Sequence, residues 1–177
     1  MGWARDVLGF WFSRDPVQWW KPDEALDAEI RERFCELWRE QRRRLPDDFL
    51  EAADHALAAV ILFDQFPRNM FRGHADQFAT DPLALAVAKG AVERGFDDGM
   101  AAERRGFLYM PFQHSEELAD QRRSLLLFAA LGEPEQLHYA RLHHDVIARF
   151  GRFPHRNACL GRKPRAEEIA AGEVAPW

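Results

Sequence analysis

Apolar residues recur along most of the chain at the three- and four-residue spacing of an α-helix. Between residues 23 and 44, Leu26, Ile30, Phe34 and Trp38 fall on one helical face. The same spacing predicts helices over residues 4–12, 49–66, 82–94, 103–109, 116–131 and 134–150, and a helix-compatible stretch over 166–171. No segment alternates apolar and polar residues over the length of a strand. We therefore expect an all-α fold, an antiparallel helical array of six to eight helices.

Capping residues and prolines set the expected ends of these helices. Asp48 is a plausible cap for the helix over residues 49–66. Pro67 should end or kink that helix, and Pro111 should end the one that begins at residue 103. Trp19 and Trp20 lie between two helical patterns, and we assign them to an irregular connection.

The length and composition are those of one globular domain. The chain has 177 residues, of which 47% are hydrophobic and 30% charged. We expect a single all-helical domain over residues 1–177, with a loose C-terminal tail from about 165 to 177. The longest apolar run, residues 56–63, is too short to span a membrane, and residues 1–12 lack the pattern of a secretory signal. These features predict a cytoplasmic protein in which Cys35 and Cys159 are free thiols.

Charge and motif content exclude several classes of function. A net charge of −5 argues against a nucleic-acid-binding protein, although residues 149–165 contain five Arg, one Lys and no acidic residue. The sequence has no phosphate-binding loop, dinucleotide-binding glycine fingerprint, nucleophile elbow or zinc-spaced cysteine set. We predict no cofactor and no metal.

Asp64 is a carboxylate placed where a helix should be apolar. On a helical wheel it shares a face with Leu57 and Val60, and an isolated buried charge is too costly to persist. An arginine or histidine partner is therefore expected, and Arg68 could reach back if Pro67 leaves the helix path intact. Asp64 is either half of a buried ion pair that fixes helix packing or the acid or base of a functional site.

Two histidines also lie at informative positions. His143 falls on the apolar face of the predicted helix over residues 134–150, where it is either a core hydrogen-bonding group or a catalytic one. His114 precedes Glu117 at a helix start. Helix capping explains the segment from His114 to Glu117. The spacing of these two residues would also allow both side chains to hold a metal.

A cluster of cationic residues follows the last long helix. Phe150-Gly151-Arg152-Phe153-Pro154-His155-Arg156-Asn157 repeats the order of Phe63-Asp64-Gln65-Phe66-Pro67-Arg68-Asn69, with Phe-Pro followed by Arg-Asn. Together with Arg149 and Arg162, these guanidinium groups suit the capture of a carboxylate or phosphate. They suit capping of helix carbonyls, or pairing with Asp64 or Glu117, equally well.

Four segments carry a family resemblance. They are Trp11-Phe12, Leu62 to Asn69 with Arg72-Gly73, Tyr109-Met110-Pro111-Phe112-Gln113-His114-Ser115-Glu116-Glu117 with Gln121, and Arg149 to Asn157 with Leu160-Gly161-Arg162. With them the sequence resembles, over nearly its whole length, the bacterial family known as domain of unknown function 924. The resemblance implies an all-helical, tetratricopeptide-like array and brings no activity, substrate or catalytic residue. The chain departs from the family pattern at Phe63, Met110 and Glu117.

The polar residues support two hypotheses for function. In the first, polar side chains converge on a pocket that binds, and could transform, a small anionic molecule. The candidate pocket residues are Asp64, Arg68, Asn69, His114, Glu117, His143, Arg149, Arg152, His155, Arg156 and Asn157. In the second, the chain is a tetratricopeptide-like scaffold that binds a protein or peptide partner, and its polar cluster is structural.

Overall fold

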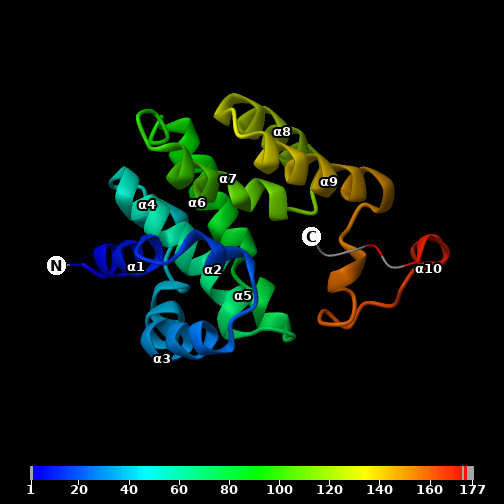
Figure 1. The fold of residues 1–177 in the computed structure, drawn as a ribbon, viewed down its shortest axis with the longest axis horizontal. Helices are drawn as coiled ribbons and strands as arrows, with labels where there is room; N and C mark the ends of the chain where they lie inside the picture. The colour runs from blue at the N-terminus through cyan, green and yellow to red at the C-terminus, as the bar shows by residue number, and fades with distance from the viewer. Residues whose placement is uncertain (1, 173, 175–177) are drawn as a thin grey trace.

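The computed structural model describes residues 2–172 and 174, which form helices and turns with no β-strand (Figure 1). The α-helices are α1 (Trp3–Phe12), α2 (Pro16–Trp20), α3 (Glu24–Gln41), α4 (Ala53–Val60), α5 (Phe66–Met70), α6 (Asp81–Glu93), α7 (Ala102–His114), α8 (Leu118–Leu131), α9 (Pro134–Phe150) and α10 (Ala166–Ala171). A π-helical turn, Ile61–Gln65, joins α4 to α5, and 3₁₀ turns occur at Pro46–Phe49, Ala75–Phe78 and Pro154–Arg156. The expected all-α array is confirmed.

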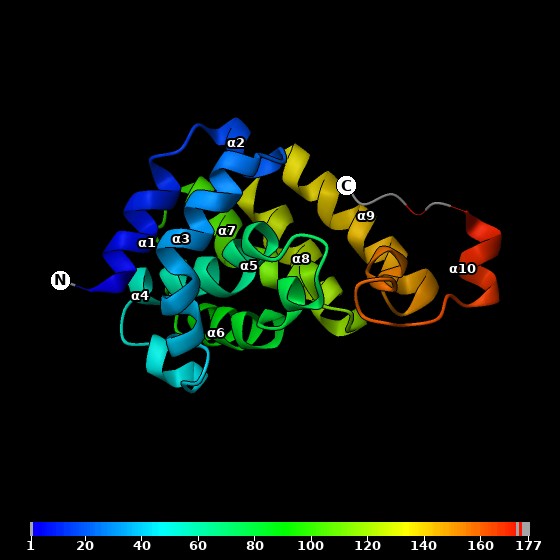
Figure 2. The same ribbon diagram turned by 90° about the horizontal axis from the view of Figure 1, so that it is seen from below.

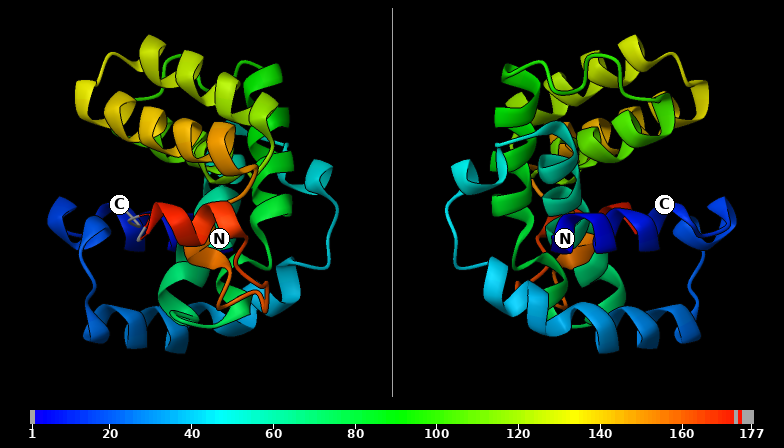
Figure 3. Two further views of the ribbon diagram at one scale, coloured as in Figure 1. Left: turned by 90° about the vertical axis from the view of Figure 1, so that its right-hand side faces the viewer. Right: turned by 90° about the vertical axis from the view of Figure 1, so that its left-hand side faces the viewer.

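Helix α7 lies at the centre of the array. It packs against α4, α6, α8 and α9, while α1 packs on α4 and α3 packs on α5. Helices α8 and α9 form one side of the molecule and α3 the opposite side (Figures 1 and 3). After α9 the chain turns away and ends in α10 at the far end of the molecule (Figure 2). The turns that carry the candidate site residues therefore gather around the C-terminal end of α7.

Aromatic side chains form the middle of the core. Trp11 lies 5.7 Å from Phe66 and 5.6 Å from Phe107 between ring centroids, both in edge-to-face geometry. Phe34 lies 4.7 Å from Phe66. All four rings are at most 4% exposed, so each contributes buried area and a favourable ring–ring geometry. This core joins α1, α3, α5 and α7 into one unit.

The helix predicted over residues 49–66 has different bounds in the structure. It begins at Ala53 rather than Phe49, which lies in a 3₁₀ turn. Beyond Val60 it continues through the π-helical turn and past Pro67 into α5. Pro67 cannot donate a hydrogen bond to the carbonyl of Phe63, but the hydroxyl of Thr80 donates to that carbonyl instead, at 2.7 Å. The helix continues through Pro67 because the side chain of Thr80 replaces the missing donor.

The expectation that Pro111 ends a helix is wrong, because α7 runs through it to His114. A proline in a helix interior costs about 3 kcal/mol. Every residue from Gly106 to Gln113 is buried, and each large apolar side chain among them contributes about 1.5–3 kcal/mol on burial. Packing of several such residues exceeds the cost of one proline. The same continuation carries His114 into the interior.

One other prediction needs correction. Trp19 and Trp20 lie in a short helix, α2, whose N-cap Asp15 accepts a hydrogen bond from the amide of Val17 at 2.9 Å. The helix-compatible stretch over residues 166–171 does form a helix, α10, in which Glu168 is 4% exposed. Residues 173 and 175–177 of the C-terminal tail lie outside the described residues.

No helix in the described part of the chain has the length and apolar character needed to cross a membrane. Cys35 and Cys159 are both free thiols, as expected.

Candidate functional site

Asp64 is completely buried, and three side chains surround its carboxylate. Nδ1 of His114 lies 2.8 and 2.9 Å from the two oxygens, Nε2 of Gln65 lies 2.5 Å away, and Nη1 of Arg68 lies 3.4 Å away. The π-helical turn ends at Gln65, one residue after Asp64, and the helix continues past Pro67. Arg68 therefore remains one turn after Asp64 and does reach back to it. Asp64 is therefore paired with both a histidine and an arginine, where the sequence predicted one or the other.

The charges of this group are set by its burial and its neighbours. Burial acts to raise the pKa of Asp64, but Arg68 and His114 oppose it and hold that pKa well below its ordinary value. Burial and the charge of Arg68 lower the pKa of His114, against the opposing effect of Asp64. At neutral pH the pair is thus a carboxylate beside a neutral imidazole.

The ionised Asp64 can only accept hydrogen bonds, so Nδ1 of His114 donates to it. Nε2 of His114 then carries a lone pair, and it has no hydrogen-bond partner among the described residues. An imidazole oriented by a carboxylate, with its second nitrogen open, is the arrangement of a general base. The side chain of His114 is 14% exposed.

Two arginines share a single acid next to this dyad. Arg68 binds Asp81 through both terminal nitrogens at 2.9 and 3.1 Å, and Nη1 of Arg156 binds the same carboxylate at 3.2 Å. Nη2 of Arg156 donates to the carbonyl of His114 at 3.0 Å, at the negative end of α7. Nε of Arg156 is buried and has no hydrogen-bond partner within residues 2–172 and 174. Burial lowers the pKa of Arg156 to about 10, with Asp81 acting against this and Arg68 adding to it.

Two further histidines extend the cluster. The ring of His143 lies 6.0 Å from that of His114 and 5.6 Å from Phe153, which in turn lies 5.5 Å from His155. Burial lowers the pKa of His143 to about 2, and His114 adds to the effect. Burial and then the charge of Arg156 lower the pKa of His155 to about 4. Both rings are neutral at physiological pH, because burial disfavours their charged forms.

Five of the predicted residues lie outside this cluster, three of them apart from it and two, Arg152 and Asn157, in an adjacent network. Asn69 donates to Asp27 at 2.7 Å in a separate group on α3 and α5. Glu117 is exposed and its side chain makes no capping bond at the start of α8. Arg149 is exposed, with its guanidinium 4.7 Å from the ring of Phe150. The metal pair considered for His114 and Glu117 is not assembled.

Arg152 and Asn157 serve a neighbouring structural network. Arg152 binds Glu168 at 2.5 and 2.8 Å, and Nδ2 of Asn157 donates to the same carboxylate at 2.9 Å. Arg162 binds Glu116 at 2.7 and 3.0 Å and also donates to the carbonyl of Phe153. These contacts hold the segment after α9 against the end of α7. They position Arg156 without placing Arg152 beside Asp64.

Sequence reasoning missed three site residues. Asp81, Glu116 and Gln65 were not among the residues selected as candidates. A first-turn acid and a site acid have the same local pattern, so no sequence signal separated Asp81 from an ordinary cap. The described residues contain no group of three or more His, Cys, Asp and Glu side chains arranged to hold a metal ion.

Comparisons with known proteins agree with this architecture. A family model described as "Bacterial protein of unknown function (DUF924)" matches residues 7–171. The chain is similar to a solved structure of a protein of unknown function, ATU0120, from Agrobacterium tumefaciens, with 42% sequence identity, 97% of each chain covered and a TM-score of 0.90. None of the curated proteins matches the chain.

Proposed function

We propose a ligand for the polar cluster of this chain, which belongs to the bacterial family of unknown function described as DUF924. The cluster binds a small anionic molecule. In this proposal Arg68 and Arg156 attract the anion, and Nε2 of His114 takes up a proton from solvent when the anion binds. Asp64 stabilises the imidazolium that then forms, as a carboxylate does when it orients a catalytic histidine. The proton returns to solvent when the ligand leaves.

One observation carries the proposal: the buried Nε donor of Arg156 has no hydrogen-bond partner in the part of the chain that the structure describes, although buried polar groups are nearly always hydrogen-bonded. The lowered pKa values of Arg156, His143 and His155 indicate that this region disfavours more positive charge. A carboxylate or phosphate would supply the missing acceptor and relieve the repulsion between the cations. The side chain of Arg68 is 22% exposed, which leaves an approach from solvent.

The test is calorimetric titration with inorganic phosphate and with small mono- and dicarboxylates, in two buffers of different ionisation enthalpy. We expect binding accompanied by proton uptake, because an anion raises the pKa of nearby histidines. Arg156→Gln should weaken binding at least about tenfold, the effect of losing a charged hydrogen bond. His114→Asn should retain binding and lose most of the proton uptake.

Arg149→Gln is the matched control, since Arg149 is exposed and lies outside the cluster. It should leave affinity and proton uptake unchanged. Thermal melts of all three variants identify any loss of folding. Equal affinity in wild type and Arg156→Gln, or no heat with any of these anions at millimolar concentration, would overturn the proposal.

A second candidate function is the tetratricopeptide-like scaffold. It is favoured by the consecutive packing of α6 on α7, α7 on α8 and α8 on α9, the order found in helical repeat proteins. Leu126 on α8 is 64% exposed and Tyr139 on α9 is 39% exposed, so partner binding would depend on such surface residues. A partner captured by wild type and by Arg156→Gln, and lost on Leu126→Ser, would favour the scaffold over the anion site.

A further inference from the structure

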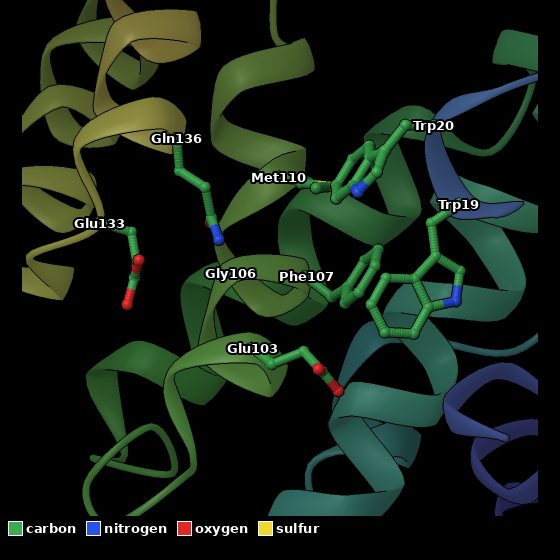
Figure 4. Close-up of a pocket in the computed structure, with 8 residues that line it drawn as sticks. All are labelled: Trp19, Trp20, Glu103, Gly106, Phe107, Met110, Glu133 and Gln136. Carbon is green, nitrogen blue, oxygen red and sulfur yellow. The ribbon is translucent and has the colours of Figure 1, made fainter. Parts of the chain in front are cut away.

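A second group of residues, near the start of α7, is aromatic and acidic, whereas the cluster around Asp64 is rich in arginine and histidine. A cavity of about 250 Å³ lies between α2, the first turns of α7 and the start of α9 (Figure 4). Pockets for drug-sized ligands occupy about 300–1,000 Å³, so this one suits a smaller molecule. None of its lining residues belongs to the Asp64 cluster.

Aromatic rings form one wall of the cavity. Trp20 stacks nearly parallel to Phe107, with 5.8 Å between centroids and 3° between planes. Trp19 meets Phe107 edge-on at 5.1 Å and Trp20 at 6.5 Å. Figure 4 shows the three rings gathered on the side of the cavity formed by α2. Trp20 is 58% exposed, so a large apolar ring is held at the rim by its neighbours rather than buried for stability.

The charged residues that line the cavity are both acidic. They are Glu103, in the first turn of α7, and Glu133, at the N-cap of α9. Glu133 makes no side-chain capping bond, and neither carboxylate has a hydrogen bond or ion pair within the described part of the chain. In Figure 4 Glu103 lies on the side of Trp19 and Glu133 on the side of Gln136. Unpaired negative charge thus lies beside the aromatic wall at Glu103 and across the cavity from it at Glu133.

A neutral acceptor completes the lining. Gln136 extends over Gly106, where a Cβ atom would lie only 2.5 Å from its amide oxygen. That oxygen is buried and has no hydrogen-bond partner among the described residues, although such groups are nearly always satisfied. The absence of a side chain at position 106 lets Gln136 pack this closely against α7. Gln136 thus lines this side of the cavity with a neutral amide.

We infer that this cavity binds a small organic cation with a methylated ammonium head. Aromatic faces attract cations through their quadrupole and are the usual recognition surface for quaternary ammonium groups. Glu103 and Glu133 add long-range attraction and exclude anions. The methyl groups contact Trp19, Trp20 and Phe107, and the carboxylates balance the charge of the ammonium head.

Calorimetric or NMR titration of the full chain with choline and with tetramethylammonium tests the inference. The matched ligand control is the neutral alcohol in which a carbon atom replaces the nitrogen of choline. It has the same shape without the charge. Choline should bind more tightly than the neutral alcohol, and its affinity should fall as salt rises, since the flanking carboxylates are near solvent. Equal affinity for the two compounds would overturn the inference.

Variants separate the ring and charge contributions. Trp20→Ala should weaken choline binding roughly fivefold or more, the factor that corresponds to one cation–ring contact, while Trp20→Phe should restore most of it. Glu133→Gln should weaken binding about two- to fivefold, as loss of a partly exposed charge does. Glu135→Gln, an exposed acid on the same helix outside the cavity, should have no effect. Unchanged affinity in both Trp20→Ala and Glu133→Gln would refute the site, and because Trp20 is exposed the fold should tolerate its loss.

Discussion

At the scale of single residues, burial and nearby charge determine the protonation state of the candidate site. Asp64 stays ionised although it is fully buried, because His114 and Arg68 solvate its charge in place of water. His143 and His155 stay neutral because burial, together with neighbouring cations, disfavours protonation of their rings. The same residue types on the surface would have ordinary pKa values. The unusual protonation is thus a property of their positions.

These pKa values predict a loss of stability in mild acid. The pKa of His143 is about 2 and that of His155 about 4 in the folded protein, against about 6.5 in an unfolded chain. Below pH 6.5 the unfolded chain therefore binds more protons than the folded one, so stability present above pH 6.5 is lost as pH falls. Each histidine should contribute a slope of about 1.4 kcal/mol per pH unit between roughly pH 6 and 4.

Urea denaturation at half-unit pH intervals measures this slope. His143→Gln should reduce it by about 1.4 kcal/mol per pH unit, because one of the two titrating groups is removed. His138→Gln, which changes an exposed histidine on the same helix, should leave the slope as in wild type. A free energy of unfolding that stays constant from pH 6.5 to 4.5 would contradict the neutral, buried state of these rings.

At the scale of helices, the chain continues through two prolines because other contacts replace or outweigh what proline removes. The carbonyl of Phe63, four residues before Pro67, accepts a hydrogen bond from the hydroxyl of Thr80. That hydroxyl also accepts a hydrogen bond from Nε1 of Trp38 at 3.0 Å. Thr80 is 3% exposed. One buried hydroxyl therefore joins α3, the π-helical turn and the start of α6. It also holds the turn that presents Asp64.

Thr80→Val should destabilise the protein by about 2 kcal/mol or more, because it leaves two buried polar groups without a partner while conserving volume. Thr80→Ser keeps the hydroxyl and should restore most of the loss. The free energy of unfolding from chemical denaturation distinguishes the three proteins. If the valine variant proved as stable as wild type, Thr80 would not be the group that compensates for Pro67.

At the scale of the whole molecule, the segment after α9 closes the candidate site from outside the main helical array. Glu168 on α10 binds Arg152 and Asn157, and Glu116 binds Arg162. Arg156, in the middle of this segment, is thereby placed against Asp81 and His114. Helix α7 connects the two proposed sites, with His114 at its end and the cation cavity along its first turns.

Glu168→Ala should loosen residues 151–171 without unfolding the rest of the protein. It removes the shared acceptor of Arg152 and Asn157, while the core of α1 to α7 lies elsewhere. Hydrogen exchange with mass spectrometry should show faster exchange in that segment and unchanged protection in α3 and α4. Uniform acceleration throughout the chain would show instead that the segment and the array unfold as one cooperative unit.

Much of the fold was already determined by local sequence. Helical periodicity predicted the regions of α3, α6, α8 and α9, because these helices carry an apolar face that only burial in a core can satisfy. The same logic marked Asp64 and His143 as polar groups in apolar surroundings that would need partners. Features that depend on spacing along a single helix can be predicted from the sequence alone.

Tertiary structure decided which partners meet. Asp64 and His114 are fifty residues apart, and Asp81 and Arg156 are seventy-five apart, so no local pattern joins them. The continuation past Pro67 and Pro111 depended on contacts with Thr80 and with the packed core, which periodicity does not describe. Asn69, Arg149 and Arg152 had patterns as suggestive as that of Arg156 and lie elsewhere. Residue type and spacing determine what a side chain can do, whereas packing between distant segments determines where it does so.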